Sequence, residues 1–182
     1  MKPFLKITAL SFLIAITYSC TSKKIAASAN STEITLPISN FDSDKNFIRS
    51  VSSGTSPNMA FAKELAFKNA ANEIAKTINT KVKSVLEDYA KQSEIQSSID
   101  FRSETERMVT ISVDQSLKNL KIVKEKIFQN QDKNYTYWVG VELSKEDVYN
   151  SLSNKISASK IKALHEDKVN FRETFDKNFE EK

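Results

Sequence analysis

The chain contains very few of the residues that break helices or form tight turns. Only two glycines and three prolines occur among its 182 residues, whereas disordered chains and turn-rich β-sandwiches use both types often. The length suits one ordinary domain with tails, because domains cluster at roughly 100–150 residues. We therefore expect one domain in which helices form much of the structure.

The charge balance gives no sign of a nucleic-acid partner. The chain has 27 Lys and Arg residues against 23 Asp and Glu residues, and two of the basic ones, Lys2 and Lys6, lie in a segment that we expect to be removed. The remainder is nearly neutral, whereas nucleic-acid binding needs basic residues clustered on one face. The sequence therefore predicts no nucleic-acid partner.

Residues 1–19 have the layout of a secretory signal peptide. Lys2 and Lys6 precede an apolar run over residues 7–16, and the small Ser19 follows, which is the three-part order of such signals. The run is too short to span a hydrocarbon core of about 30 Å as a helix. We expect residues 1–19 to be cleaved; an N-terminal membrane anchor or a core helix is the alternative.

The single cysteine, Cys20, stands where cleavage is expected. One cysteine cannot form a disulfide within the chain, so in an exported protein it is free, paired between chains or modified. Thr17-Tyr18-Ser19-Cys20 resembles the lipobox of bacterial lipoproteins, which implies an acylated Cys20 and stable anchoring in membrane lipid. The residues after Cys20 lack the acidic signals of inner-membrane retention and of surface export. This favours the outer membrane, with the domain facing the periplasm.

The expected domain organisation has three parts after the signal. Residues 20–46 are rich in Ser, Thr, Ala and Asn without a sustained period, which predicts an acylated cysteine followed by a flexible tether. Residues 47–152 carry the periodic patterns of an α+β domain with a small, mainly antiparallel sheet and helices packed on it. Residues 153–182 form a charged, amphipathic helical tail.

The first half of the domain begins with a short strand candidate over residues 47–51. Gly54 suits a turn, Ser56 a helix cap and Pro57 a first helical position. A helix follows, in which small residues recur every four positions and let it lie close to its neighbour; they are Ala62, Ala66 and Ala70. For residues 82–89 the pattern fits a helix or a strand equally well.

The second half alternates helix and strand signals. Ser103-Glu104-Thr105-Glu106 fits a capping box before a second helix, and residues 120–128 form an irregular strand. After a polar loop, residues 135–143 alternate cleanly, with Trp138 on the face opposite to Tyr135 and Tyr137, which predicts a strand. Ser144-Lys145-Glu146-Asp147 then caps another helix.

These residues resemble a known family in their order. The Gly54-Thr55-Ser56 turn, the helix with Ala62-Lys63-Glu64-Leu65-Ala66, and the strand Tyr137-Trp138-Val139-Gly140-Val141 resemble the Lpp-twenty family of outer-membrane lipoproteins, and the module is similar to the N-terminal domain of a flagellar assembly protein. The resemblance covers about residues 47–152. It implies a small α+β fold, favours a strand for residues 82–86, and brings no catalytic residues.

The sequence contains few residues that indicate catalytic chemistry. The only histidine, His165, has no second His or free Cys with which to form a zinc site, and two glycines 86 residues apart cannot form a phosphate loop. Glu104 with Glu106, or Glu94 with Asp100, is a conceivable carboxylate pair for glycoside hydrolysis. The sequence therefore predicts no cofactor, no metal and no enzyme, with a lipid-anchored hydrolase of envelope polymers as the alternative.

Two features are candidate contacts for a partner. Trp138 is an aromatic side chain on the outer face of its strand, and aromatic rings favour interfaces. The tail has one apolar helical stripe that docks on its own domain, pairs with another chain or meets a partner; it consists of Leu164, Phe171, Phe175 and Phe179. We expect a non-catalytic envelope module that binds a protein or cell-wall partner; its oligomeric state stays open.

Overall fold

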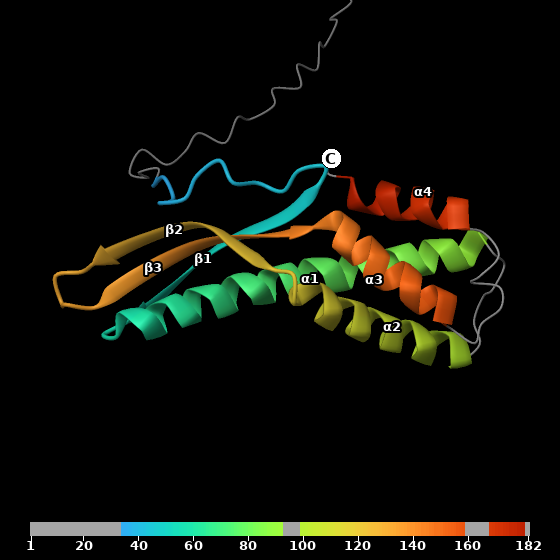
Figure 1. The fold of residues 1–182 in the computed structure, drawn as a ribbon, viewed down its shortest axis with the longest axis horizontal. Coiled ribbons are helices and arrows are strands. Elements are labelled where there is room, and N and C mark those ends of the chain that lie inside the picture. Colours follow the sequence, from blue (N-terminus) through green and yellow to red (C-terminus); the bar gives the residue numbers. More distant parts are fainter. Residues whose placement is uncertain (1–33, 93–98, 159–167, 181–182) are drawn as a thin grey trace, which may run out of the picture. The chain divides into compact units, whose positions relative to one another are not determined.

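The computed structural model describes residues 34–92, 99–158 and 168–180. Along the chain these residues form β1 (Phe47–Ser56), α1 (Met59–Gln92), α2 (Ile99–Leu117), β2 (Lys121–Gln129), β3 (Tyr135–Ser144), α3 (Lys145–Ala158) and α4 (Lys168–Phe179). The strands form one antiparallel sheet in the order β1-β3-β2; α1 runs along one face of it and extends past its end, where α2, α3 and α4 pack (Figure 1). The predicted α+β class is confirmed, including the C-terminal helix.

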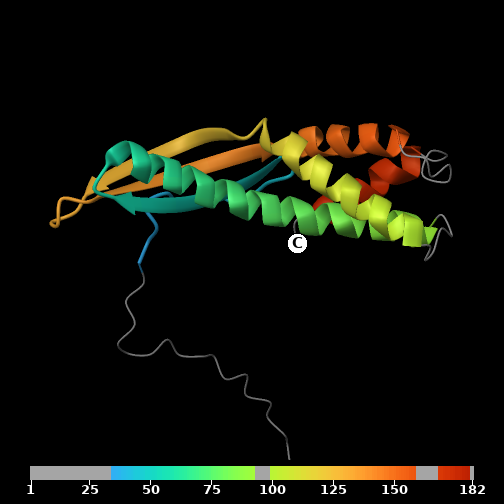
Figure 2. The ribbon, with the colours of Figure 1, turned by 90° about the horizontal axis from the view of Figure 1, so that it is seen from below.

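The central strand β3 separates the two faces of the sheet. Val139, Val141 and Leu143 are buried in the hydrophobic core, and Tyr137 packs against that core. Successive side chains of a strand point to opposite faces, so Trp138 and Gly140 lie on the other side, as the alternation predicted. α1 covers the buried face, as the view from below shows (Figure 2).

α1 approaches the sheet closely because small residues face each other across the contact. Ala62, Ala66 and Ala70 are fully buried, and a Cβ added to Gly54 of β1 would lie 2.6 Å from the backbone nitrogen of Ala66. Gly54 therefore lies inside β1 and does not form the predicted turn; no glycine in the described residues has a positive φ. The family-like Gly-Thr-Ser sequence serves close packing here.

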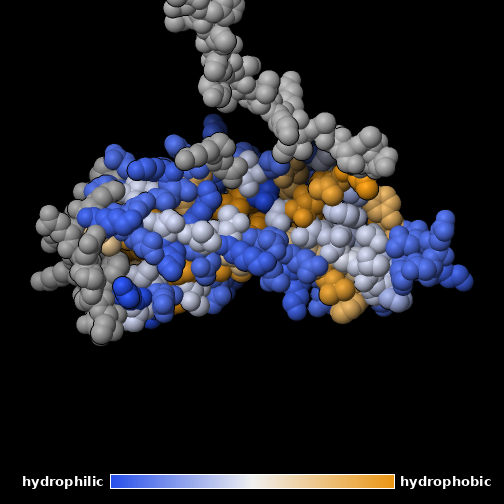
Figure 3. All heavy atoms as spheres, turned by 180° about the vertical axis from the view of Figure 1, so that it is seen from behind, coloured by the Kyte–Doolittle hydropathy of each residue, from blue (hydrophilic) through white to orange (hydrophobic). Residues whose placement is uncertain are grey.

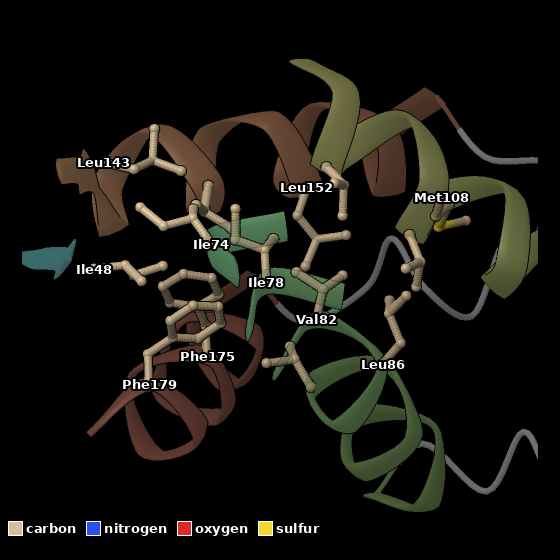
Figure 4. Packing of buried hydrophobic residues seen from close by; sticks show 14 of the residues in the cluster. Ile48, Ile74, Ile78, Val82, Leu86, Met108, Leu143, Leu152, Phe175 and Phe179 are labelled. Carbon is tan, nitrogen blue, oxygen red and sulfur yellow. The ribbon is translucent and has the colours of Figure 1, made fainter. Parts of the chain in front are cut away.

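The second half of α1 packs against other helices. Its buried side chains are larger than alanine, and they meet Met108 of α2, Leu152 of α3 and Phe175 of α4 in one core (Figure 4). They are Ile78, Val82, Val85, Leu86 and Tyr89. Residues 82–86 are thus helical, and the strand that the family resemblance implied is wrong, because this stretch lies where helices surround it.

Of the three predicted helix starts, two differ in the structure and one is confirmed. α1 begins at Met59 with Asn58 as its cap, since the Phe61 N–H donates to Asn58 Oδ1 at 3.1 Å; Ser56 and Pro57 precede the helix. α2 begins at Ile99, so Ser103 lies inside the helix and not at its cap. Ser144 does cap α3, because its Oγ accepts the Glu146 N–H at 3.2 Å.

α4 is fixed by its rings and by two lysines at its C-terminal end. Phe175 and Phe179 are stacked with centroids 4.2 Å apart, and both are buried. The last carbonyl groups of a helix lack partners within it; here Lys81 Nζ donates to the Asn178 carbonyl at 3.2 Å and Lys145 Nζ to the Phe179 carbonyl at 2.6 Å. The helix dipole also favours the positive charges of both lysines at this C-terminal end.

Replacing Gly54 by alanine tests the close contact between β1 and α1. Because the added Cβ meets backbone atoms of α1 that cannot rotate away, we expect a loss of about 2 kcal/mol or more of unfolding free energy. Urea denaturation measures it. In the matched variant Gly140→Ala the new Cβ meets the end of the Phe41 ring at 2.9 Å, which can shift, so that loss is expected to stay below about 1 kcal/mol. Equal losses would contradict this account of Gly54.

Replacing Lys145 by methionine tests how α4 is held. The change keeps the apolar stem and removes the donor to the Phe179 carbonyl. We therefore expect the free energy of unfolding to fall by about 1.5–3 kcal/mol, which is typical of a hydrogen bond to a charged group. Urea denaturation and hydrogen exchange of α4 amides measure it. Lys177→Met is the control, because Lys177 lies exposed on α4 and such changes stay within about 0.5 kcal/mol.

Candidate interaction surface

The face of the sheet that α1 does not cover is the candidate interaction surface, and we call it the open face. Strand register places the side chains of paired residues on the same face. The open face therefore consists of Arg49, Val51, Ser53 and Thr55 from β1, Thr136, Trp138, Gly140 and Glu142 from β3, and Lys121, Lys124, Lys126 and Phe128 from β2.

Part of the open face is covered by residues 37–46, which precede β1. The Phe41 ring lies against Gly140, where a Cβ would be 2.9 Å from it, and Ile38 is only 4 % exposed. Figure 1 shows this segment on the side of the sheet opposite to α1. The tether predicted to reach residue 46 thus includes residues that pack on the domain. Its apolar side chains Ile38 and Phe41 pack there against the sheet face that α1 leaves uncovered.

Asp44 and Arg49 hold this segment in place. The Asp44 carboxylate accepts the backbone N–H groups of Asn46 and Phe47 at 2.7 and 2.9 Å, and it pairs with Arg49 at 2.7 Å. The hydrogen bond from Asn46 and those from Phe47 and Arg49 lower the pKa of Asp44 below its ordinary value. Arg49 also pairs with Glu142 of β3 at 3.1 Å, which links the segment to the sheet.

Trp138 lies on the open face two positions before Gly140 on β3. It is half-buried, and its register partners are Ser53 of β1 and Lys126 of β2. Thr55 and Thr136 next to it share a hydrogen bond of 3.0 Å across the strands. Trp138 is the only tryptophan of the chain, so its fluorescence reports on this surface alone.

A β-bulge places three lysines of β2 in one row on the open face. The register shifts between Ile122 and Lys124, so Val123 has no partner on β3. Because of this extra residue, Lys121 shares its face with Lys124 and Lys126, although it is an odd number of positions away from both. Glu125 points to the other face, where the hydrogen bond from Lys63 of α1 at 2.6 Å lowers the pKa of Glu125.

The exposed apolar side chains belong to the half of the domain that holds the sheet. Figure 3 shows them gathering there, beside the hydrophilic tip of the β2–β3 hairpin, while the helical half is mostly hydrophilic. In the part of the chain from residue 35 on, the large ones are Leu36, Met59, Phe61, Val123, Ile127 and Phe128. Clustered exposed apolar groups mark interaction surfaces more often than single ones do.

The other candidate contacts lie elsewhere. Phe171, Phe175 and Phe179 are buried in the core, so among the alternatives for the tail the structure shows docking on its own domain. Leu164 lies outside the described residues, and so does Cys20. Sequence reasoning found Trp138 by alternation, but it missed the lysine row, because a bulge cannot be read from the pattern of residues 120–128.

The residues considered for hydrolysis do not form a described pair. Glu104 accepts a hydrogen bond from Arg107 Nε at 2.9 Å on α2, and Glu106 is exposed on the same helix. Glu94 and His165 lie outside the described residues, and the Asp100 side chain is likewise not described. Within the described ranges no group of His, Cys, Asp or Glu side chains could hold a metal ion.

A cavity among the described residues has compensated charges. It measures about 620 Å³ and lies between the segment before β1, the start of α3, and α4. Its central Arg172 pairs with Glu146 at 2.8 Å and with Asp176 at 3.0 Å. An arginine already held by two carboxylates is a poor anion receptor, so this cavity is a weaker candidate than the open face.

Comparison with known proteins gives no further guide. No family model, no curated protein and no solved structure matches the chain. Of the helices described, none has the length and apolar character needed to cross a membrane.

Replacing Asp44 by alanine tests whether this residue fastens the covering segment. The backbone N–H groups of Asn46 and Phe47 lose their acceptor, so we expect both to exchange hydrogen several times faster by mass spectrometry or NMR. Asp42→Ala is the control. Arg49 bonds the backbone carbonyl of Asp42, which this change keeps, so exchange at Asn46 and Phe47 should stay unchanged in this variant. Folding lowers the pKa of Asp44, so the stability that its carboxylate contributes to the folded chain is present above about pH 4. It is lost as the pH falls through the lowered pKa.

Proposed function

We propose that this protein is a lipoprotein of the bacterial envelope and that it works as a non-catalytic interaction module. The observation that carries the proposal is the order of the N-terminal residues: a basic start, an apolar run too short to span a bilayer, and the lone Cys20 in a lipobox-like sequence. Acyl chains on Cys20 would hold the domain at the outer membrane, facing the periplasm, with negligible dissociation.

The surface chemistry of the domain supports an interaction role. Exposed apolar groups and Trp138 gather on the sheet half, and the described carboxylates on α2 are exposed or paired with arginine. The open face is the contact surface in this proposal, and its partner is a component of the envelope. The Gly54-Thr55-Ser56 and Tyr137–Val141 sequences, which resemble the Lpp-twenty family, agree with such a role, although the helix over residues 82–86 departs from that family's expected strand.

Intact-mass analysis and membrane fractionation of the wild type and of Cys20→Ala test the anchor. The full-length gene is expressed in a bacterium that processes lipoproteins. We expect a mature wild-type chain that begins at Cys20, carries added acyl mass and sediments with membranes. Cys20→Ala should lack the acyl mass and leave the membrane fraction.

A further variant that keeps Cys20 is the control that separates anchoring from folding. Ser19→Ala keeps a small residue before Cys20 and should be processed and sedimented like the wild type. A wild-type chain that lacks acyl mass, or that retains residues 1–19, would contradict the lipoprotein assignment.

A further inference from the structure

We propose that the lysine row of β2, together with Phe128 and Trp138, is a docking surface for an anionic phospholipid bilayer. The lysine row consists of Lys121, Lys124 and Lys126. The inference rests on the proposed function in one respect: it names the envelope component that the open face meets.

The geometry of the row suits a broad, flat, negatively charged partner. Side chains on one face of a strand are spaced about 6.6–6.8 Å apart, and the strand holds them in a line. β2 is an edge of the sheet, so only β3 lies beside it. Figure 1 shows it running along the border of the sheet. All three lysine side chains are exposed beside the segment that covers part of the open face, so a planar partner that lies along this edge can contact them together.

The charges of the row are not neutralised within the described part of the chain. Lys121 and Lys126 form no ion pair there, and Lys124 lies 4.8 Å from the centroid of the Phe41 ring. Of the neighbouring carboxylates, Glu125 points to the other face and is bound to Lys63, and Glu142, the register partner of Lys121, is bound to Arg49. The row thus presents net positive charge, which complements anionic headgroups.

Apolar side chains accompany the lysines, as membrane contact requires. Val123 at the bulge and Phe128 at the end of β2 are 44 % and 46 % exposed, and Trp138 pairs with Lys126 across the strands. Lysines on an edge strand can serve only to prevent pairing with another sheet. That purpose would be weakened by exposed Val and Phe beside them, whereas an interfacial surface needs both basic and apolar groups.

The covering segment brings the chain toward this same edge. Pro37, Ile38 and Ser39 line a groove of about 390 Å³ together with residues 123–126 of β2. Sixteen residues lie between Cys20 and Pro37, so the two lie at most about 60 Å apart whatever the path of the chain. A bilayer that holds Cys20 is therefore within reach of the lysine row.

Fluorescence of Trp138 tests the proposal without a label. The full-length protein is purified from a bacterium that processes lipoproteins and is placed in vesicles of phosphatidylcholine alone or mixed with phosphatidylglycerol, both containing phosphatidylcholine with brominated acyl chains. We expect the bromine to quench Trp138 only when phosphatidylglycerol is present, and high salt to relieve the quenching.

Two matched variants assign the effect to the lysine row. Replacing Lys121, Lys124 and Lys126 together by glutamine should weaken docking roughly a hundredfold, about fivefold for each lysine, and so abolish quenching. Replacing Lys68, Lys76 and Lys83 of α1 by glutamine removes the same charge from another exposed surface and should leave quenching unchanged. Circular dichroism establishes that both variants are folded.

The quenching result tests the lysine row independently of whether Cys20 carries the lipid anchor. Quenching that is absent, independent of phosphatidylglycerol or equal in both triple variants overturns the proposal; docking on an acidic protein or on a second copy would give the first of these results. Intact mass of the same sample reports acylation independently. If Cys20 is not acylated, the protein is added to preformed vesicles, and the same readout still judges the lysine row.

Discussion

The length of α1 relative to the sheet determines how the rest of the domain is built. Its 34 residues extend about 51 Å at 1.5 Å per residue, whereas β1 and β3 have ten residues each and span about 34 Å. The sheet can cover only the first part of this helix. The remaining apolar stripe needs other partners, and α2, α3 and α4 supply them, as Figures 1 and 2 show.

The residues of α1 change in size at the point where its neighbours change. Alanines lie over β1, where Gly54 leaves room for the helix backbone, and larger side chains from Ile74 onward fill the space between helices. A helix lies close to a sheet when the side chains on both contacting surfaces are small. A bundle of helices needs larger side chains, because it must be filled to the density of a protein interior. One helix thus joins two kinds of core.

This change explains which features the sequence could predict. The strand over residues 135–143 was predictable because burial on one face forces alternation, and the α3 cap because Ser144 acts locally. Residues 82–86 were ambiguous because β-branched residues suit both a strand and the interior of a helix bundle. Gly54 was misjudged as a turn residue, since its role depends on Ala66, which approaches it only in the folded chain.

The open face was predictable in part for the same reason. Trp138 follows from alternation, but its neighbours depend on a bulge that shifts the register at Val123. Without that extra residue, Lys121 would share the face of Glu125 and lie toward α1, and the basic row would be shorter by one charge. A single unpaired residue therefore decides whether the lysines of β2 are divided between two faces or concentrated on one. Concentrated on one face beside exposed Val123 and Phe128, they give this small sheet a surface that differs in character from the rest of the domain.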